Sequence, residues 1–402
     1  MDMENRELAK SPFLSRPERP GVYVAAGHGP YENTRRALSQ IDMSGLKGKR
    51  VLLKPNAGRI AFPGEGITTE PQVVAAAIDA FLEAGAVLAL GESPITGVKA
   101  LEALESSGIT AVAGQKNCEI IDLDARPGVE IALAQGRAIR GITVCPEVFD
   151  VDYVVSLPVM KVHMHTGVTL SVKNMKGCLW RRSKVDLHML PLVEGSSERP
   201  LDIAITDMSK VLKPHLAIID GTIGMEGMGP SAGQAKPLGV VIVSADAFAA
   251  DAVACALMGL EAGNIAHLRL GAERGYGIID LDNIDIQPRN WPDFVNPFQP
   301  PPENLSIEFP GIEILDENSC SACQSTLLLF LKRYGEQVFD YFPKCKPIHL
   351  AIGKGHEKLP SGTVCIGNCT TDHRDQGIFV TGCPPVGSAI LKTIAEGEKK
   401  KD

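Results

Sequence analysis

Short apolar runs alternate with helical stretches along most of this 402-residue chain, and that alternation limits the fold more than any other feature. The apolar runs that read as strands are Val22–Ala26, Val51–Asn56, Ala86–Leu90, Asp152–Leu157, Leu216–Asp220 and Leu238–Ser244. Helical stretches such as Val73–Glu83 and Ala247–Met258 lie between them. Strands that are apolar on both sides and alternate with helices indicate an α/β fold with a mostly parallel sheet covered by helices.

Length and proline content predict two domains. A chain of 402 residues exceeds what one core usually covers, and seven prolines gather between residues 286 and 311. We therefore expect an N-terminal arm over 1–20, an α/β core domain over 21–285, a proline-rich linker over 286–311 and a smaller α/β domain over 312–402.

Charge and hydropathy exclude several classes of protein. The net charge of −8 argues against nucleic-acid binding, which needs a basic surface to neutralise phosphates. The N-terminus is polar and lacks the apolar core of a signal peptide, and no long uncharged apolar run predicts a membrane span. We expect a cytoplasmic protein, in which clustered cysteines indicate a metal or redox site before they indicate disulfides.

Six of the ten cysteines lie in the last quarter of the chain, between Cys320 and Cys383. Four of them are expected just after a strand or at the start of a helix: Cys320, Cys323, Cys369 and Cys383. Because the carboxyl ends of parallel strands meet at one edge of a sheet, these thiols are expected to converge. Four thiolates at short and long spacings are typical of an iron–sulfur cluster, here expected to be [4Fe–4S].

The cysteines are also compatible with alternatives to an iron–sulfur cluster. Zinc is the main alternative metal, although a second closely spaced pair of the zinc-ribbon kind is absent, and a dithiol redox site or packed thiols are further alternatives. Cys365 lies inside an apolar strand and is held in reserve as a ligand in place of Cys369. Among the other cysteines, Cys118, Cys145, Cys255 and Cys345 are expected to be packing or incidental residues.

A basic stretch stands out in this acidic chain. Residues 161–184 contain six Lys or Arg residues and no carboxylate. They predict a pocket for a carboxylate or phosphate, with Lys161, His163, Lys173 and Asn174 as contacts and a solvated basic surface as the alternative. Segments 54–56 and 91–93 also end strands and are candidates to line the same crevice. The histidines at 163 and 165 are expected to be structural or to contact substrate rather than metal.

A glycine-rich segment, Gly221–Pro230, follows another predicted strand. A loop of this kind can present backbone N–H groups to an anion. The segment matches neither the dinucleotide-binding nor the phosphate-loop motif, so nucleotide binding is not predicted.

Several segments taken together resemble the family called domain of unknown function 362. They are Lys54–Asn56, Pro158–His163, Ser171–Gly177, Asp220-Gly221, Met225–Pro230 and Ser244–Asp251. The resemblance covers about residues 20–290 and implies an α/β iron–sulfur protein, without an established reaction. Many members carry a ferredoxin-type module with tightly spaced cysteines, whereas here the cysteines fall in a separate C-terminal domain.

Three functions are compatible with these features. The first is an iron–sulfur redox enzyme of anaerobic-type metabolism that acts on a small anionic substrate in the basic crevice. The second is a lyase or hydratase in which an open iron acts as a Lewis acid. The third is an electron carrier or redox sensor that docks to a partner protein.

Overall fold

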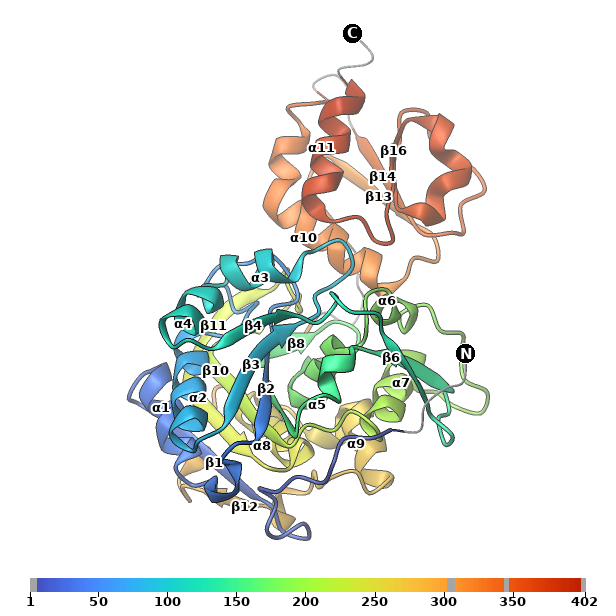
Figure 1. Ribbon diagram of the computed structural model, residues 1–402. Helices are drawn as coiled ribbons and strands as arrows, with labels where there is room; N and C mark the ends of the chain where they lie inside the picture. Colours follow the sequence, from blue (N-terminus) through green and yellow to red (C-terminus); the bar gives the residue numbers. More distant parts are fainter. Residues whose placement is uncertain (1–5, 302–307, 343–346, 399–402) are drawn as a thin grey trace. The chain divides into compact units, whose positions relative to one another are not determined.

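The larger part of the chain is built on one twisted sheet of mostly parallel strands (Figure 1). The computed structural model describes residues 6–301, 308–342 and 347–398. The main path of the sheet runs in the order β12-β1-β11-β10-β7-β2-β3-β4, and β8 pairs with both β10 and β9. The strands are β1 (Gly21–Ala26), β2 (Arg50–Pro55), β3 (Val87–Glu92), β4 (Glu119–Asp122), β7 (Tyr153–Leu157), β8 (Val159–His163), β9 (Gly167–Thr169), β10 (Leu216–Glu226), β11 (Gln234–Ser244) and β12 (Asp285–Gln287). A separate antiparallel hairpin is formed by β5 (Val129–Ala132) and β6 (Gly141–Val144).

Helices cover both faces of this sheet. They are α1 (Pro30–Leu38), α2 (Pro71–Glu83), α3 (Ala100–Ser106), α4 (Ile109–Gln115), α5 (Ser171–Asn174), α6 (Ser183–Asp186), α7 (Pro200–Ser209), α8 (Ala247–Leu257) and α9 (Ala266–Glu273). Buried side chains of α1, α2 and α4 form one core with Val51 and Leu53 of β2. Those of α5, α7, α8 and α9 form the other core with Leu52 of the same strand. Successive residues of a strand point to opposite faces, so a strand buried on both sides must be apolar throughout.

The predicted fold class is confirmed. Strand β2 pairs in parallel with β3 and β7, and β10 pairs in parallel with β7 and β8. The antiparallel pairings within the sheet are those of β11 with β1 and β10, and that of β8 with β9. The carboxyl ends of β2, β3 and β7 therefore lie along one edge.

The glycine-rich segment differs from its prediction as an anion-binding loop. Strand β10 continues through Glu226 and forms a hairpin with β11, with a register irregularity between Gly221 and Ile223. A side chain at Gly221 would approach Val240 Cγ2 to 2.7 Å, and one at Gly224 would approach the Met160 carbonyl oxygen to 2.6 Å. These glycines permit close contact between strands.

The ends of the predicted core domain also differ from expectation. Instead of a loose arm, the segment before β1 lies against the core: Leu8 N donates to Val211 O at 3.0 Å, and the Phe13 and Tyr153 ring centroids are 5.8 Å apart. The first part of the predicted linker is likewise attached, because β12 pairs with β1 and Phe298 is buried. The chain divides into two compact units, residues 1–301 and 302–402.

The second unit is a smaller parallel α/β sheet in the order β13-β14-β15-β16. Its elements are β13 (Ile312–Asp316), α10 (Ser321–Val338), β14 (Ile348–Ile352), β15 (Val364–Ile366), the 3₁₀ segment η7 (Asn368–Gln376), β16 (Ile378–Val380) and α11 (Gly387–Glu398). Helix α10 begins at Ser321, so Cys323 lies in its first turn. A small α/β domain carrying the cysteines is therefore present, as predicted.

Candidate functional site

Three of the predicted anion contacts come together on the first unit. Lys161 and His163 are two residues apart on β8, so their side chains leave the same face of the strand. Thr169 of β9 lies directly opposite Lys161. Lys173 of α5 donates to Thr169 Oγ1 at 3.2 Å, which brings the two lysines to either side of this threonine.

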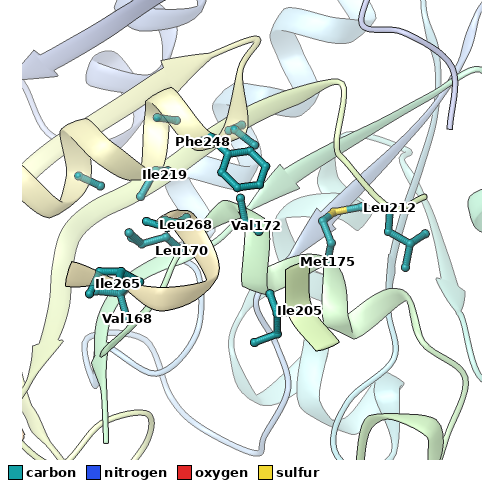
Figure 2. Packing of buried hydrophobic residues seen from close by; sticks show 14 of the residues in the cluster. Val168, Leu170, Val172, Met175, Ile205, Leu212, Ile219, Phe248, Ile265 and Leu268 are labelled. Atoms are coloured by element: carbon teal, nitrogen blue, oxygen red, sulfur yellow. The ribbon is translucent and has the colours of Figure 1, made fainter. Parts of the chain in front are cut away.

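The short helix α5 is held firmly in place. The backbone N–H groups of Ser171 and Val172 donate to the Asp251 carboxylate of α8 at 2.7 and 3.0 Å. Val172 and Met175 pack into the buried core (Figure 2). Burial raises the pKa of Asp251 to about 7, and the two N–H groups oppose that rise by stabilising the charged form. This anchoring fixes the position of Lys173, the residue after Val172.

Lys161 is buried without an anionic partner. Its Nζ donates to Asn56 Oδ1 at 2.6 Å and to the Ile67 carbonyl oxygen at 2.8 Å. Burial first, and then the nearby Arg59 guanidinium, lower the pKa of Lys161 to about 7, while the Glu92 carboxylate acts in the opposite direction. In the part of the chain that the structure describes, no carboxylate lies within ion-pair distance of Lys161 or Lys173.

Further basic side chains surround these lysines. Burial lowers the pKa of His163 well below its ordinary value, and Lys173 adds to the effect. Burial also lowers the pKa of Lys173 strongly, and Lys176 adds to that effect. Four half-buried basic side chains lie close enough to affect the pKa values of Lys161, His163 or one another: Arg59, His165, Lys176 and His188. We call these seven side chains, from Arg59 to His188, the basic site.

The protonation of His163 is defined by its backbone contact. The His165 N–H donates to His163 Nδ1 at 3.1 Å, so a neutral His163 carries its proton on Nε2. The Asp202 carboxylate, which favours the charged form of Lys173, lies 3.1 Å from His267 Nδ1. Two buried lysines that lack an ion-paired carboxylate among the described residues are suited to binding a small anion.

The fourth predicted contact, Asn174, belongs to a neighbouring network instead. Its Nδ2 donates to Lys54 O at 3.2 Å and to Ser156 Oγ at 3.1 Å. Its Oδ1 accepts from Lys54 Nζ, which also donates to both oxygens of Glu92 at 2.7 and 2.9 Å. The polar atoms of Asn174 are thus occupied in holding a buried ion pair at the ends of β2 and β3.

The rest of the basic stretch divides between buried and exposed positions. Lys184 is buried, where it donates to the Leu179 carbonyl oxygen at 2.6 Å and to the hydroxyl of Ser93. Arg181 and Arg182 are exposed, and the first of these lies over the Trp180 ring. A solvated surface therefore describes only the two arginines.

The four predicted cluster ligands all lie at the carboxyl edge of the small sheet. Cys320 and Cys323 follow β13, at the cap and in the first turn of α10. Cys369 follows β15, and Cys383 follows β16. Parallel pairing of these strands brings the loops that follow them to the same edge.

The thiols are close enough to affect one another's ionisation. A hydrogen bond from Cys323 and nearby backbone N–H groups lower the pKa of Cys320 to about 6. The pKa of Cys323 is raised by that hydrogen bond first, then by burial and by the charges of Cys320, Cys369 and Cys383. The structure thus brings together the four cysteines that the sequence singles out.

Cys365, the alternative to Cys369 as a ligand, has its sulfur directed away from the four predicted ligands. Cys365 is buried in β15, and its sulfur lies 3.4 Å from the His373 carbonyl oxygen. Cys118, Cys145 and Cys255 are buried in the first unit, while Cys345 lies outside the described residues.

Asn368 joins two of the cysteine loops. Its Oδ1 accepts from Gly382 N at 2.8 Å and from Thr381 Oγ1 at 3.2 Å, while its own N–H donates to Gly382 O at 2.7 Å. Gly382 has a φ of 145°, and a side chain there would approach Pro385 Cα to 2.7 Å. These contacts set the loop of Cys369 beside that of Cys383.

The donor set fits an iron–sulfur cluster, because four cysteine sulfurs are its usual ligands. Within residues 6–301, 308–342 and 347–398, no group of three or more His, Cys, Asp or Glu side chains is placed to hold a metal ion. A cluster is wider than one ion, so its ligands stand farther apart than those of a single zinc.

Two residues of the basic site escape detection in the sequence. Arg59 lies in the loop after β2, and His188 lies beyond the basic stretch. The position of Arg59 just past the strand end at Asn56 is a usable signal, whereas His188 has no local pattern around it.

Comparison with known proteins finds a matching family, a similar sequence and a solved structure. The family profile described as Domain of unknown function (DUF362) matches residues 51–256. A thylakoid-associated protein from Synechocystis sp. is 31% identical over 228 residues, which cover 56% of this chain and 68% of that protein. The lactate racemase apoprotein from Thermoanaerobacterium thermosaccharolyticum is 11% identical with a TM-score of 0.37, over 67% of this chain and 62% of that one. None of the described helices has the length and apolar character needed to cross a membrane.

Proposed function

Since this chain belongs to the DUF362 family, we propose that it is an iron–sulfur protein that acts on a small anionic substrate bound by the basic site. The observation that carries the proposal is the burial of Lys161 and Lys173 without a carboxylate partner among the described residues. Burial disfavours the charged form of Lys173, and a bound carboxylate or phosphate would stabilise that form.

Each residue of the basic site has a part in this proposal. Lys173 has one hydrogen-bond acceptor, Thr169 Oγ1, and so has N–H groups left to donate to an anion. His163 offers its Nε2–H, and the half-buried members of the site provide the approach from solvent. Cys320, Cys323, Cys369 and Cys383 would hold the cluster, which when bound supplies electron transfer. Thiols with this role need a reducing compartment, so we place the protein in the cytoplasm.

Anaerobic purification with iron and acid-labile sulfide analysis and EPR spectroscopy tests the cluster. We expect iron and sulfide in equal amounts, with loss of most iron when any of the four cysteines is changed to Ser. Cys365→Ser is the matched control, because this cysteine lies on the same strand–loop segment and faces away. A colourless protein with stoichiometric zinc would refute the cluster.

Anion binding is tested separately by isothermal titration with phosphate and with oxalate. Lys173→Met should weaken binding at least about tenfold, the loss expected for one charged hydrogen bond. Lys392→Met is the control, since that side chain is 76% exposed. Equal binding by the Lys173 variant and the wild type would reject the basic site and favour an electron carrier.

A further inference from the structure

The hydrogen bonds of Lys161 match those of a neutral amine. An ammonium group has three N–H donors, whereas a neutral amine has two donors and one lone pair. Lys161 Nζ makes two hydrogen bonds, to Asn56 Oδ1 and to the Ile67 carbonyl oxygen, and both acceptors are uncharged. Both hydrogens of an amine are thereby used, and its lone pair is directed away from these two oxygens.

Lys54 is a second buried lysine, and it has a carboxylate partner. It is as deeply buried as Lys161, yet it contacts both oxygens of Glu92 and the oxygens of Pro55 and Asn174. Among the described residues, Lys54 therefore has a carboxylate partner and Lys161 has none. The Arg59 and Lys54 side chains near Lys161 disfavour a further positive charge, while the Glu92 carboxylate, which is paired with Lys54, acts in the opposite direction.

Lys161 lies next to His163 and Lys173, the side chains that would bind an anion. His163 lies two residues along the same strand face, and Lys173 contacts Thr169, the cross-strand partner of Lys161. A ligand whose anionic group is bound by Lys173 and His163 would place its adjoining carbon atoms near Lys161. A desolvated lysine beside other cations is the usual setting for imine formation with a carbonyl compound.

We propose that Lys161 Nζ forms an imine with the carbonyl carbon of a small oxo compound that carries a carboxylate or phosphate group. The lone pair of Nζ attacks the carbonyl carbon and forms the N–C bond. The C–O bond then breaks, and the two amine hydrogens leave with that oxygen as water. No oxidant or reductant takes part. This inference rests on the proposed anion site and adds the class of its ligand.

Reductive trapping of the full-length protein tests the proposal. The protein is incubated at neutral pH with glyoxylate, pyridoxal 5′-phosphate or pyridoxal, each with sodium cyanoborohydride, and labelled lysines are located by peptide mass mapping. We expect Lys161 to be labelled at least about tenfold faster than the exposed Lys99 and Lys392. Faster labelling by glyoxylate would identify a carboxylate ligand, and faster labelling by pyridoxal 5′-phosphate a phosphate ligand.

Two variants and one binding measurement separate the outcomes. Lys173→Met should slow labelling of Lys161 by the two anionic probes and leave labelling by pyridoxal unchanged. Lys161→Met should abolish the adduct, with its fold checked by tryptophan fluorescence. Phosphate or oxalate binding without any Lys161 adduct would overturn the imine and leave the anion site in place. Absence of both binding and adduct would overturn the proposed function as well.

Discussion

The buried ion pair between Lys54 and Glu92 allows a quantitative test of the region beside the basic site. Both side chains are almost fully enclosed, with exposed fractions of 1% and 2%. The Glu92 carboxylate also accepts from the backbone N–H groups of Ala57 and Ser93, at 3.0 and 2.9 Å. Replacing one partner therefore leaves a buried charge, whereas replacing both removes the charge altogether.

The expected loss of unfolding free energy depends on the hydrogen bonds that the remaining charged group keeps. Breaking a buried ion pair by removing one partner costs about 3–5 kcal/mol. Lys54→Met leaves the carboxylate two backbone donors, which places the expected loss of unfolding free energy at the lower end, about 3 kcal/mol. Glu92→Leu leaves the ammonium two neutral acceptors and should cost a similar amount. The double variant should lose much less than both losses together, with a coupling energy of at least about 2 kcal/mol.

Urea unfolding followed by tryptophan fluorescence measures these values. The chain has two tryptophans, Trp180 and Trp291, and both lie in the first unit, so the signal reports that unit. Lys99→Ala, Glu102→Ala and their double variant are the control, because that pair is equally short at 2.6 Å but exposed. Its coupling should be too small to measure, because solvent screens an exposed pair. Additive losses at the buried pair would refute the reasoning.

Three further predictions concern packing, pH and the cysteine loops. Gly177→Ala would put a Cβ 2.5 Å from both charged groups of the buried ion pair and should destabilise the first unit by about 2–4 kcal/mol. Gly114→Ala, in α4 with open space around it, should cost nothing in the same urea titration. The pKa of Lys161 is lowered to about 7 in the folded protein, so the unfolded chain holds its proton more tightly and stability should rise from pH 7 to about 10.5. That rise should be smaller in Lys161→Met, and an identical pH profile would contradict a neutral amine. Asn368→Ala should lower the iron bound per chain, whereas Asn368→Asp, which keeps the acceptor for Gly382 N, should retain it; equal iron in both would exclude a role for this side chain.

The fold class and the cysteine positions follow from local patterns. Strand β2 reads as a continuous apolar run because both faces of the sheet are covered, and this is visible in sequence. The four predicted cysteines lie at strand ends in a sheet whose parallel direction is itself predictable. Their convergence could therefore be anticipated without knowing any contact.

Glycine-rich and proline-rich segments predicted the local structure less well than the apolar strands did. Gly221 and Gly224 read as a loop, yet they lie in β10, which pairs with β11. Glycine is needed at both positions because neighbouring backbone and side chains leave no room for a Cβ. The proline-rich segment reads as a linker, yet Phe298 anchors part of it in the core of the first unit. Both contacts join residues far apart in sequence, so no local pattern reports them.

The sequence by itself determined that the chain is a parallel α/β protein with cysteines at one sheet edge and a concentration of basic residues after β7. Only the tertiary structure decided which basic residues stay without a carboxylate. Lys54 and Lys161 both follow or lie within apolar strands, but Glu92 reaches one and not the other. Asn174 stands beside Lys173 in the chain and yet serves the ion pair, because adjacent residues on a helical turn point in different directions. The charge state of a buried lysine depends on such three-dimensional neighbours, which composition and spacing do not specify.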